Sequence, residues 1–443
     1  MTIEEFGRRL RAKEITSAGV TDECLTRIEA DNPRLNAFIL VMADEARRQA
    51  RDLDAELASG RDRGPLHGVP ISIKDLMDVR GTATTAASKV RTGHVADRDA
   101  AAIAHLRQAG AVIVGKTNLH EFAFGTTNED SAYGPARNPH DPSRTPGGSS
   151  GGSAASVAAG MALATVGTDT GGSIRIPAAA CGIVGLKPTV GEISTDGVIP
   201  LSQTFDHVGP LTQSVADASL VYHALLGDHA AVLPAPRPVS GLRIAVLRKY
   251  FCDVLDAEVR ARFEETIARL RAGGAHVDGI DIHGAEEISP VYLHIQLADA
   301  SAYHAATLES TPDLYTRPVR LRLEMGRYVL AEDYVRALHG RERLQRMTDA
   351  ALAQHDALLL PTLPIPAPPI GATTVDVDGK AEPVRMMMLR LTQLFNVTGH
   401  PAIAMPMGST EKGLPCSAQL VGCRMQTDTL LRTALACEAL IRS

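Results

Sequence analysis

The chain lacks several features that would assign it to other classes of protein. It contains no tryptophan, no run of 18 apolar residues and no cluster of basic residues. A membrane-spanning helix needs such an apolar run, and a nucleic-acid-binding surface needs such a basic cluster. The formal net charge of −6 gives no electrostatic reason to expect a nucleic-acid partner. We therefore expect neither a membrane nor a nucleic acid among its direct partners.

Cysteine is sparse, and its spacing argues against two structural roles. The six cysteines, at positions 24, 181, 252, 416, 423 and 437, form no C-x-x-C pair. Neither a disulfide framework nor a zinc site is predicted, so we expect reduced core cysteines and no metal or other cofactor. Residues 1–10 contain no apolar segment of the kind found in secretory signals. The composition favours a cytoplasmic enzyme.

The apolar pattern predicts alternating helices and strands. We predict helices that end at Asn32-Pro33, that run over about 43–59 and 97–109, and that run from Val259 to Gly273-Gly274. We predict buried strands over 69–74, 112–114, 244–247 and 358–361. Such alternation predicts a large α/β fold with helices on both faces of a sheet. Length alone would allow about three domains, but no linker or charge run divides the chain, and we predict one domain over residues 1–443.

Glycine is abundant around two serines. Ser149 lies in the run Gly147–Ser153, and Ser173 ends the run Gly167–Ser173, while Lys74 lies upstream after Ile71-Ser72-Ile73. A serine hydroxyl needs a neighbouring base to become a nucleophile, and lysine can be that base when its neutral form is favoured. Taken alone, a glycine- and serine-rich run is most often a flexible linker. A lone lysine after such a segment is most often a surface strand end.

Two further motifs match known patterns but lie in the wrong context. The segment Gly110–Thr117 fits the phosphate-binding pattern G-x-x-x-x-G-K-T. Its apolar interior predicts a buried strand instead, and a helix precedes it where a P-loop requires a strand. The segment Gly147–Gly151 fits the nucleophile elbow G-x-S-x-G, but the three prolines in 138–146 argue against the strand that an elbow must follow.

Several segments together closely resemble the amidase signature family. They are Gly68–Asp75, Gly115–Asn118, Asn138-Pro139, Gly147–Ser153, Gly167–Arg175, Cys181–Thr189, Asn396–Pro406 and Gly413–Gly422. The resemblance covers about 65–440. It is weaker between about 228 and 356, where we expect a divergent, substrate-facing segment that includes Tyr292. It implies a large mixed β-sheet between two layers of helices.

The resemblance also implies a Ser-cisSer-Lys triad. In this chain Ser173 matches the acyl-forming nucleophile, Ser149 the bridging serine and Lys74 the general base. The Gly148–Ser149 peptide bond is cis in the family. The backbone N–H groups of Thr170, Gly171, Gly172 and Ser173 match the oxyanion hole.

The residues around the site leave the substrate open. Phe124 and Gly125 lie in a segment much like that of the glutaminase subunit of tRNA-dependent amidotransferases. Those enzymes usually carry an aspartate seven residues before the equivalent of Asn396, and this chain has Leu389 there. We consider two interpretations of Met386–Leu389: an ordinary core helix, or an adaptable apolar wall in which Met388 and Leu389 contact a bulky substrate.

We therefore predict a stand-alone serine amidohydrolase that cleaves the C–N bond of a small apolar or aryl amide or carbamate through an acyl-enzyme. Carbamate cleavage would make it a urethanase, and esters should also be substrates. The alternative is the glutaminase subunit of a tRNA-dependent amidotransferase, which needs a partner protein. The sequence does not decide the oligomeric state, and a homodimer remains open.

Overall fold

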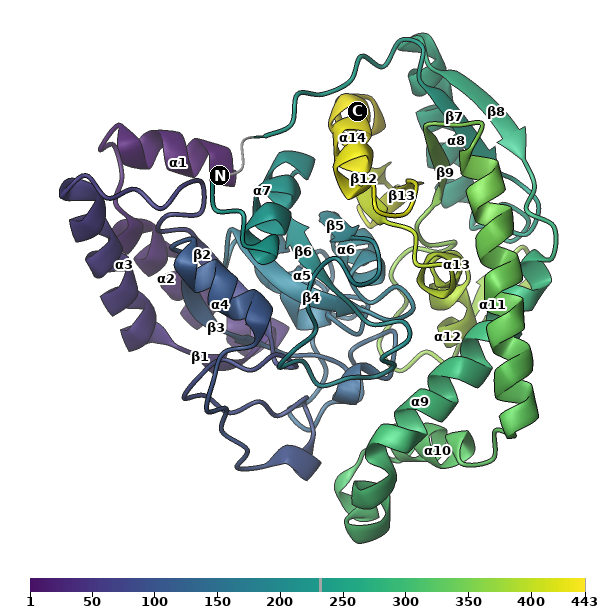
Figure 1. Ribbon diagram of the computed structural model, residues 1–443, viewed down its shortest axis with the longest axis horizontal. Coiled ribbons are helices and arrows are strands. Elements are labelled where there is room, and N and C mark those ends of the chain that lie inside the picture. The colour runs from purple at the N-terminus through teal and green to yellow at the C-terminus, as the bar shows by residue number, and fades with distance from the viewer. Residues whose placement is uncertain (231–232, 443) are drawn as a thin grey trace.

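The computed structural model describes residues 1–230 and 233–442, and its centre is one mixed sheet of 11 strands (Figure 1). Across the sheet the strands are β1 (Phe38–Val41), β3 (Val112–Thr117), β2 (Pro70–Lys74), β4 (Ala164–Asp169), β6 (His207–Thr212), β5 (Val184–Lys187), β12 (Ala402–Ser409), β13 (Pro415–Val421), β9 (Ala357–Pro361), β7 (Arg243–Leu247) and β8 (His276–Ile280). The trio β3, β2, β4 and the trio β9, β7, β8 pair in parallel, and the strands between them pair antiparallel. The predicted α/β class is confirmed.

Helices cover both faces of the sheet. One layer contains α1 (Ile3–Arg11), α4 (Ala101–Gln108), α7 (Val215–Leu226), α8 (Ala257–Ala272) and α14 (Thr427–Arg442). The other contains α2 (Ser17–Leu35), α3 (Ala43–Ala58), α5 (Gly151–Ala158) and α6 (Arg175–Cys181). Because side chains alternate along a strand, β2 serves both layers: Ile71 and Ile73 join the core cluster of α4 and α7, whereas Ser72 contacts Ser156 of α5.

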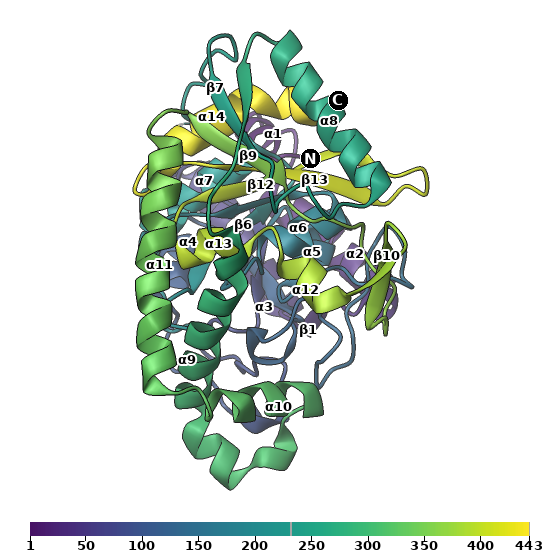
Figure 2. The same cartoon turned by 90° about the vertical axis from the view of Figure 1, so that its right-hand side faces the viewer.

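Three helices form a separate group beside the sheet. They are α9 (Ile288–Ser310), α10 (Arg317–Gly326) and α11 (Ala331–Leu352), and α9 packs against both of the others. Figure 2 shows α11 and α9 side by side, with α10 below them. The remaining elements are α12 (Val384–Leu389), α13 (Gln393–Val397), the hairpin β10 (Thr374–Val377) and β11 (Lys380–Pro383), and 3-10 turns at Lys89–Arg91, Glu121–Ala123, Ala285–Glu287 and Pro312–Leu314.

The phosphate-binding pattern at Gly110–Thr117 is a strand, as predicted. All residues of β3 are buried, and the Lys116 ammonium forms an ion pair of 2.7 Å with Asp75. A lysine held in this way contacts no phosphate. No helix in the part of the chain that the structure describes combines the length and apolar character that a membrane crossing needs.

The structure corrects two predicted helix ends. The helix expected to stop at Asn32-Pro33 continues to Leu35, and Asn36 ends it in the left-handed conformation by donating its N–H to the Asn32 carbonyl. Proline in a last turn loses one backbone hydrogen bond but does not force the helix to stop there. The helix expected from about 97 begins at Ala101, after Ala100 in an extended conformation.

Candidate active site

The ends of two neighbouring parallel strands place the predicted base. Lys74 is the last residue of β2 and Asp169 the last residue of β4, and the two strands pair in register from Ile71 and Ala164. Carboxyl ends of parallel strands meet at one edge of a sheet, where ligand sites of open α/β sheets gather. Lys74 therefore lies beside the loop that follows β4.

Lys74 is fully buried and contacts two hydroxyl groups. Its Nζ lies 2.8 Å from Ser149 Oγ and 2.7 Å from Thr168 Oγ1. Burial lowers the pKa of Lys74 to about 7, against the opposing fields of Asp206 and Asp169. Because removal from water disfavours the ammonium, a large share of this side chain is a neutral amine at neutral pH.

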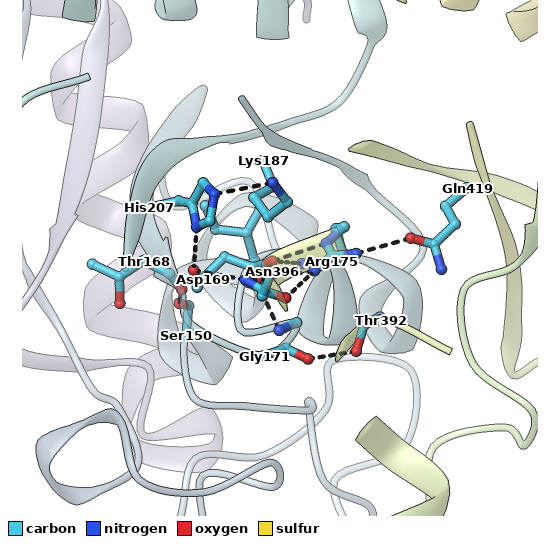
Figure 3. Close-up of polar contacts among 12 residues, drawn as sticks. Ser150, Thr168, Asp169, Gly171, Arg175, Lys187, His207, Thr392, Asn396 and Gln419 are labelled. Carbon is cyan, nitrogen blue, oxygen red and sulfur yellow. Dashed lines mark hydrogen bonds and ion pairs between the residues drawn. The ribbon is translucent and has the colours of Figure 1, made fainter. Parts of the chain in front are cut away.

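Two other lysines are buried, and their contacts differ from those of Lys74. Lys116 is paired with Asp75. Lys187 Nζ donates to the carbonyls of Pro188 and His400. It also lies 3.1 Å from Nε2 of His207, whose Nδ1 lies 3.1 Å from the Asp169 carbonyl oxygen (Figure 3). Among the described residues, Lys74 is the buried lysine that contacts a serine.

Glycines let the two serine segments approach the rest of the site. The Gly148–Ser149 peptide bond is cis, as the family resemblance implied. A Cβ at Gly148 would lie 2.8 Å from the backbone nitrogen of Asn128, so only glycine fits there. The Ser150 N–H donates to the Ser173 carbonyl at 3.3 Å, which joins the two runs.

Ser173 itself is 6% exposed and lies at the surface of the buried cluster. No hydrogen bond links its side chain to Ser149 in the described part of the chain. Catalytic hydrogen bonds often form only when substrate is bound. The roles of Ser173, Ser149 and Lys74 thus remain predictions, and the geometry directly supports the Lys74–Ser149 contact.

The loop after β4 is held by the Asp169 carboxylate. Its Oδ1 accepts from the Gly172 N–H at 2.7 Å, and its Oδ2 accepts from the Ile174 N–H at 3.2 Å. Gly172 therefore already has an acceptor, and we do not propose it as an oxyanion donor. The N–H groups of Thr170, Gly171 and Ser173 donate to no protein acceptor within residues 1–230 and 233–442. These three N–H groups therefore remain the predicted donors of the oxyanion hole.

A buried network fixes Asp169 (Figure 3). Arg175 Nε lies 3.0 Å from Asp169 Oδ2, and its Nη2 donates to Asn396 Oδ1 at 2.7 Å. Asn396 returns a hydrogen bond of 2.7 Å to Asp169, and Arg175 Nη1 donates to Gln419 at 3.0 Å. Burial alone would raise the pKa of Asp169, but the Arg175 guanidinium and its neighbours hold that pKa far below its usual value. The loop is therefore anchored by an ionised carboxylate.

The four residues predicted to line a pocket divide into two groups. Met388 and Leu389 of α12 are buried in an apolar cluster with Ile176 of α6, which favours the core-helix interpretation. Phe124 is buried near two guanidinium groups, and a Cβ at Gly125 would lie 2.1 Å from the His120 ring. Gly125 therefore serves the packing of His120.

Sequence reasoning did not predict the side-chain contacts of three residues close to this site. Thr168 is the second contact of Lys74, and Thr170 donates to Asp206 at 2.5 Å, although both lie in motifs of the family. Tyr292 lies in the divergent segment, and its hydroxyl would be 2.3 Å from a Cβ at Gly171. No local sequence signal marks Tyr292, because it reaches the loop from α9.

Comparisons with known proteins agree with this arrangement. A sequence model of the amidase family matches residues 19–431. The chain is 42% identical to an amidase from Pseudomonas putida over 452 residues, which cover 99% of this chain and 95% of that protein. It is 37% identical over 475 residues to a glutamyl-tRNA(Gln) amidotransferase subunit from Carboxydothermus hydrogenoformans, covering 99% and 96%. A crystal structure of an amidase superposes with a TM-score of 0.94 at 38% identity over 100% of both chains.

The fold is that of the amide hydrolases to which the chain is similar. The chain belongs to the amidase signature family.

Proposed function

We propose that the chain is a stand-alone serine amidohydrolase that cleaves the C–N bond of a small amide or carbamate with an apolar or aryl body. The observation that carries this proposal is the contact of 2.8 Å between Lys74 Nζ and Ser149 Oγ, with the pKa of Lys74 lowered to about 7 by burial. A lysine in that state accepts a proton at neutral pH.

In the proposed reaction Ser173 Oγ attacks the substrate carbonyl and gives its proton to Ser149, which gives its own proton to Lys74. The N–H groups of Thr170, Gly171 and Ser173 stabilise the oxyanion of the tetrahedral intermediate. Lys74 then returns the proton through Ser149 to the leaving nitrogen. Water hydrolyses the acyl-enzyme on Ser173 by the same relay. A carbamate substrate releases an amine on acylation, and hydrolysis of the resulting carbonate ester on Ser173 gives an alcohol or phenol and CO₂. An ester follows the same route with an alcohol as leaving group.

The second candidate is the glutaminase subunit of a tRNA-dependent amidotransferase. The 37% identity to an amidotransferase subunit favours it. Leu389 argues against it, because this buried apolar side chain stands where those subunits usually have an aspartate that helps to hold glutamine. The stand-alone hydrolase therefore agrees better with the described residues.

The test uses the purified chain without any partner. It is incubated with glutamine, a fatty amide, an acyl anilide and an aryl carbamate, and ammonia, amine and CO₂ are followed. We expect amine release from the anilide or carbamate, and none from the Ser173→Ala variant. Turnover of glutamine alone, or no turnover until a partner protein is added, would contradict the stand-alone interpretation.

A further inference from the structure

Arg385 is a cation that the protein does not neutralise. It lies in α12, and its guanidinium is 5.8 Å from the centroid of the Phe124 ring. Within residues 1–230 and 233–442 it forms no ion pair and no hydrogen bond. Burial lowers the pKa of Arg385 to about 10, and the field of Arg322 lowers it further. The Arg385 side chain is half-buried, and a partly desolvated charge is stabilised by a counter-charge, so this guanidinium is suited to receive one.

A second guanidinium adds to the positive charge around Phe124. Arg322 of α10 lies 5.9 Å from the centroid of the same ring and donates through Nη1 to the Phe124 carbonyl at 2.6 Å. Burial lowers the pKa of Arg322, and Asp130 opposes that shift. The Asp130 carboxylate is itself 3.0 Å from His120 Nε2. The Asp130 carboxylate, which already contacts His120, is therefore the negative charge that acts on both Arg322 and Arg385.

The ring and the helix that hold these charges both border the candidate active site. The His120 N–H, four residues before Phe124, donates to the Ser149 carbonyl at 3.1 Å. On the other side, Leu389 at the end of α12 accepts a backbone hydrogen bond from Thr392, and Thr392 Oγ1 donates to the Gly171 carbonyl at 2.6 Å. The helix that carries Arg385 is thus linked to the oxyanion loop, and the ring beneath its guanidinium belongs to the segment that contacts the bridging serine.

Tyr292 connects the two regions. The Tyr292 hydroxyl adjoins Gly171. Burial raises the pKa of Tyr292, and the positive charge of Arg385 opposes part of that rise. The Tyr292 hydroxyl donates to no protein acceptor among the described residues. The Tyr292 hydroxyl and the Arg385 guanidinium can both donate hydrogen bonds, and an anionic group of a substrate would accept them.

We propose that the substrate carries a carboxylate, which Arg385 binds with the help of Arg322, while the Phe124 ring contacts its apolar or aryl body. This inference rests on the proposed amidohydrolase function and narrows its substrate class. The planar guanidinium fork matches the two oxygens of a carboxylate, and such a paired contact fixes the orientation of the substrate.

The test compares matched anilides that differ in one charge. N-phenylsuccinamate carries the carboxylate on the acyl side, and 4-butyramidobenzoate carries it on the amine side. Each is paired with a neutral analogue in which a methyl ketone replaces the carboxylate, and release of the aromatic amine is measured. We expect kcat/KM for at least one anionic compound to exceed that of its neutral analogue by about 10- to 100-fold, the range of hydrogen bonds to charged groups.

Variants then assign the preference to Arg385. Arg385→Met should remove the preference by lowering kcat/KM for the anion alone, and Arg385→Lys should keep part of it. Arg390→Met is the matched control, because Arg390 also lies over an aromatic ring, that of Tyr250 at 4.1 Å, in the same segment of the chain. This control should keep the full preference.

Labelling by a fluorophosphonate distinguishes failure of the carboxylate subsite from failure of the proposed hydrolase activity. Wild type and Arg385→Met should both be labelled, because the probe is neutral. If the wild type is labelled but turns over the anionic and neutral compounds equally, the carboxylate inference is overturned and the hydrolase proposal stands. Loss of anionic and neutral turnover to the same extent in Arg385→Met would overturn it too, by assigning Arg385 a structural role. Failure of both labelling and turnover in the wild type would contradict the proposed function itself.

Discussion

Replacing Lys74 by methionine should inactivate the enzyme and stabilise it at neutral pH. The pKa of Lys74 falls from 10.5 to about 7 on folding. Between these values the unfolded chain binds more protons than the folded chain, so the stability of the wild type rises with pH through this window. At about 1.4 kcal/mol per pH unit, keeping this lysine in its site costs about 4 kcal/mol at pH 7 and about 2 kcal/mol at pH 9.

The methionine variant loses this cost and also the two hydrogen bonds to Ser149 and Thr168, at about 1 kcal/mol each. We therefore expect Lys74→Met to raise the free energy of unfolding by about 2 kcal/mol at pH 7 and to leave it nearly unchanged at pH 9. The measurement is urea unfolding at both values, followed by far-ultraviolet circular dichroism because the chain has no tryptophan.

The exposed Lys380 provides the control for this comparison. Its ammonium is solvated in the folded and the unfolded chain, so Lys380→Met should change stability equally at pH 7 and pH 9. The free energy of unfolding of Lys74→Met relative to wild type should differ between pH 7 and pH 9. An equal difference at both pH values would contradict the lowered pKa of Lys74, since a lysine with an unshifted pKa gives that result.

Three further predictions concern the same site. The rate constant kcat/KM for a neutral ester should fall about tenfold per pH unit below about 7 as Lys74 becomes protonated; a flat profile down to pH 5 would remove Lys74 as the base. Gly171→Ala should lower kcat/KM with an unchanged circular dichroism spectrum, because its Cβ would lie 2.3 Å from the Tyr292 hydroxyl. The control Gly279→Ala, whose Cβ would have its nearest contact at 3.3 Å, should leave kcat/KM unchanged. Asp169→Asn should lower the free energy of unfolding by about 3–5 kcal/mol, the usual effect of breaking a buried ion pair, and urea midpoints equal to wild type would show that the Arg175 network does not hold the loop.

Local patterns predicted four strands of the 11-stranded sheet. The buried apolar runs gave β7 and β9 nearly to the residue, since such runs fit strands covered on both faces. The alternation of Ile71 and Ile73 with Ser72 gave β2. The predicted strand at 112–114 is longer and ends at Thr117, because Gly115 and Lys116 do not look apolar. The buried Lys116 is stabilised by Asp75, a contact that no local pattern reveals.

The candidate site was predicted where residues close in sequence carry it. The cis Gly148–Ser149 bond followed from the family resemblance. The burial of Lys74 did not follow from its strand, because a lone lysine at that place is most often a surface strand end. The contacts that join Asp169 and Arg175 to Asn396 span more than 200 residues. The sequence did not mark Arg385, which precedes Met386–Met388, as a site residue. Whether an acidic side chain lies near this arginine depends on the fold and not on its neighbours in the sequence.

We propose that Ser173 is the nucleophile and that Ser149 and Lys74 activate it. The decisive experiment treats wild type, Ser173→Ala and Ser150→Ala with a fluorophosphonate and maps the modified residue by mass spectrometry. Ser150 is a neighbouring buried serine whose hydroxyl donates to the Thr168 carbonyl at 3.2 Å. We expect a label on Ser173 in the wild type and in Ser150→Ala, and neither label nor hydrolysis in Ser173→Ala. A label on another residue, or amide hydrolysis that survives in Ser173→Ala, would contradict it.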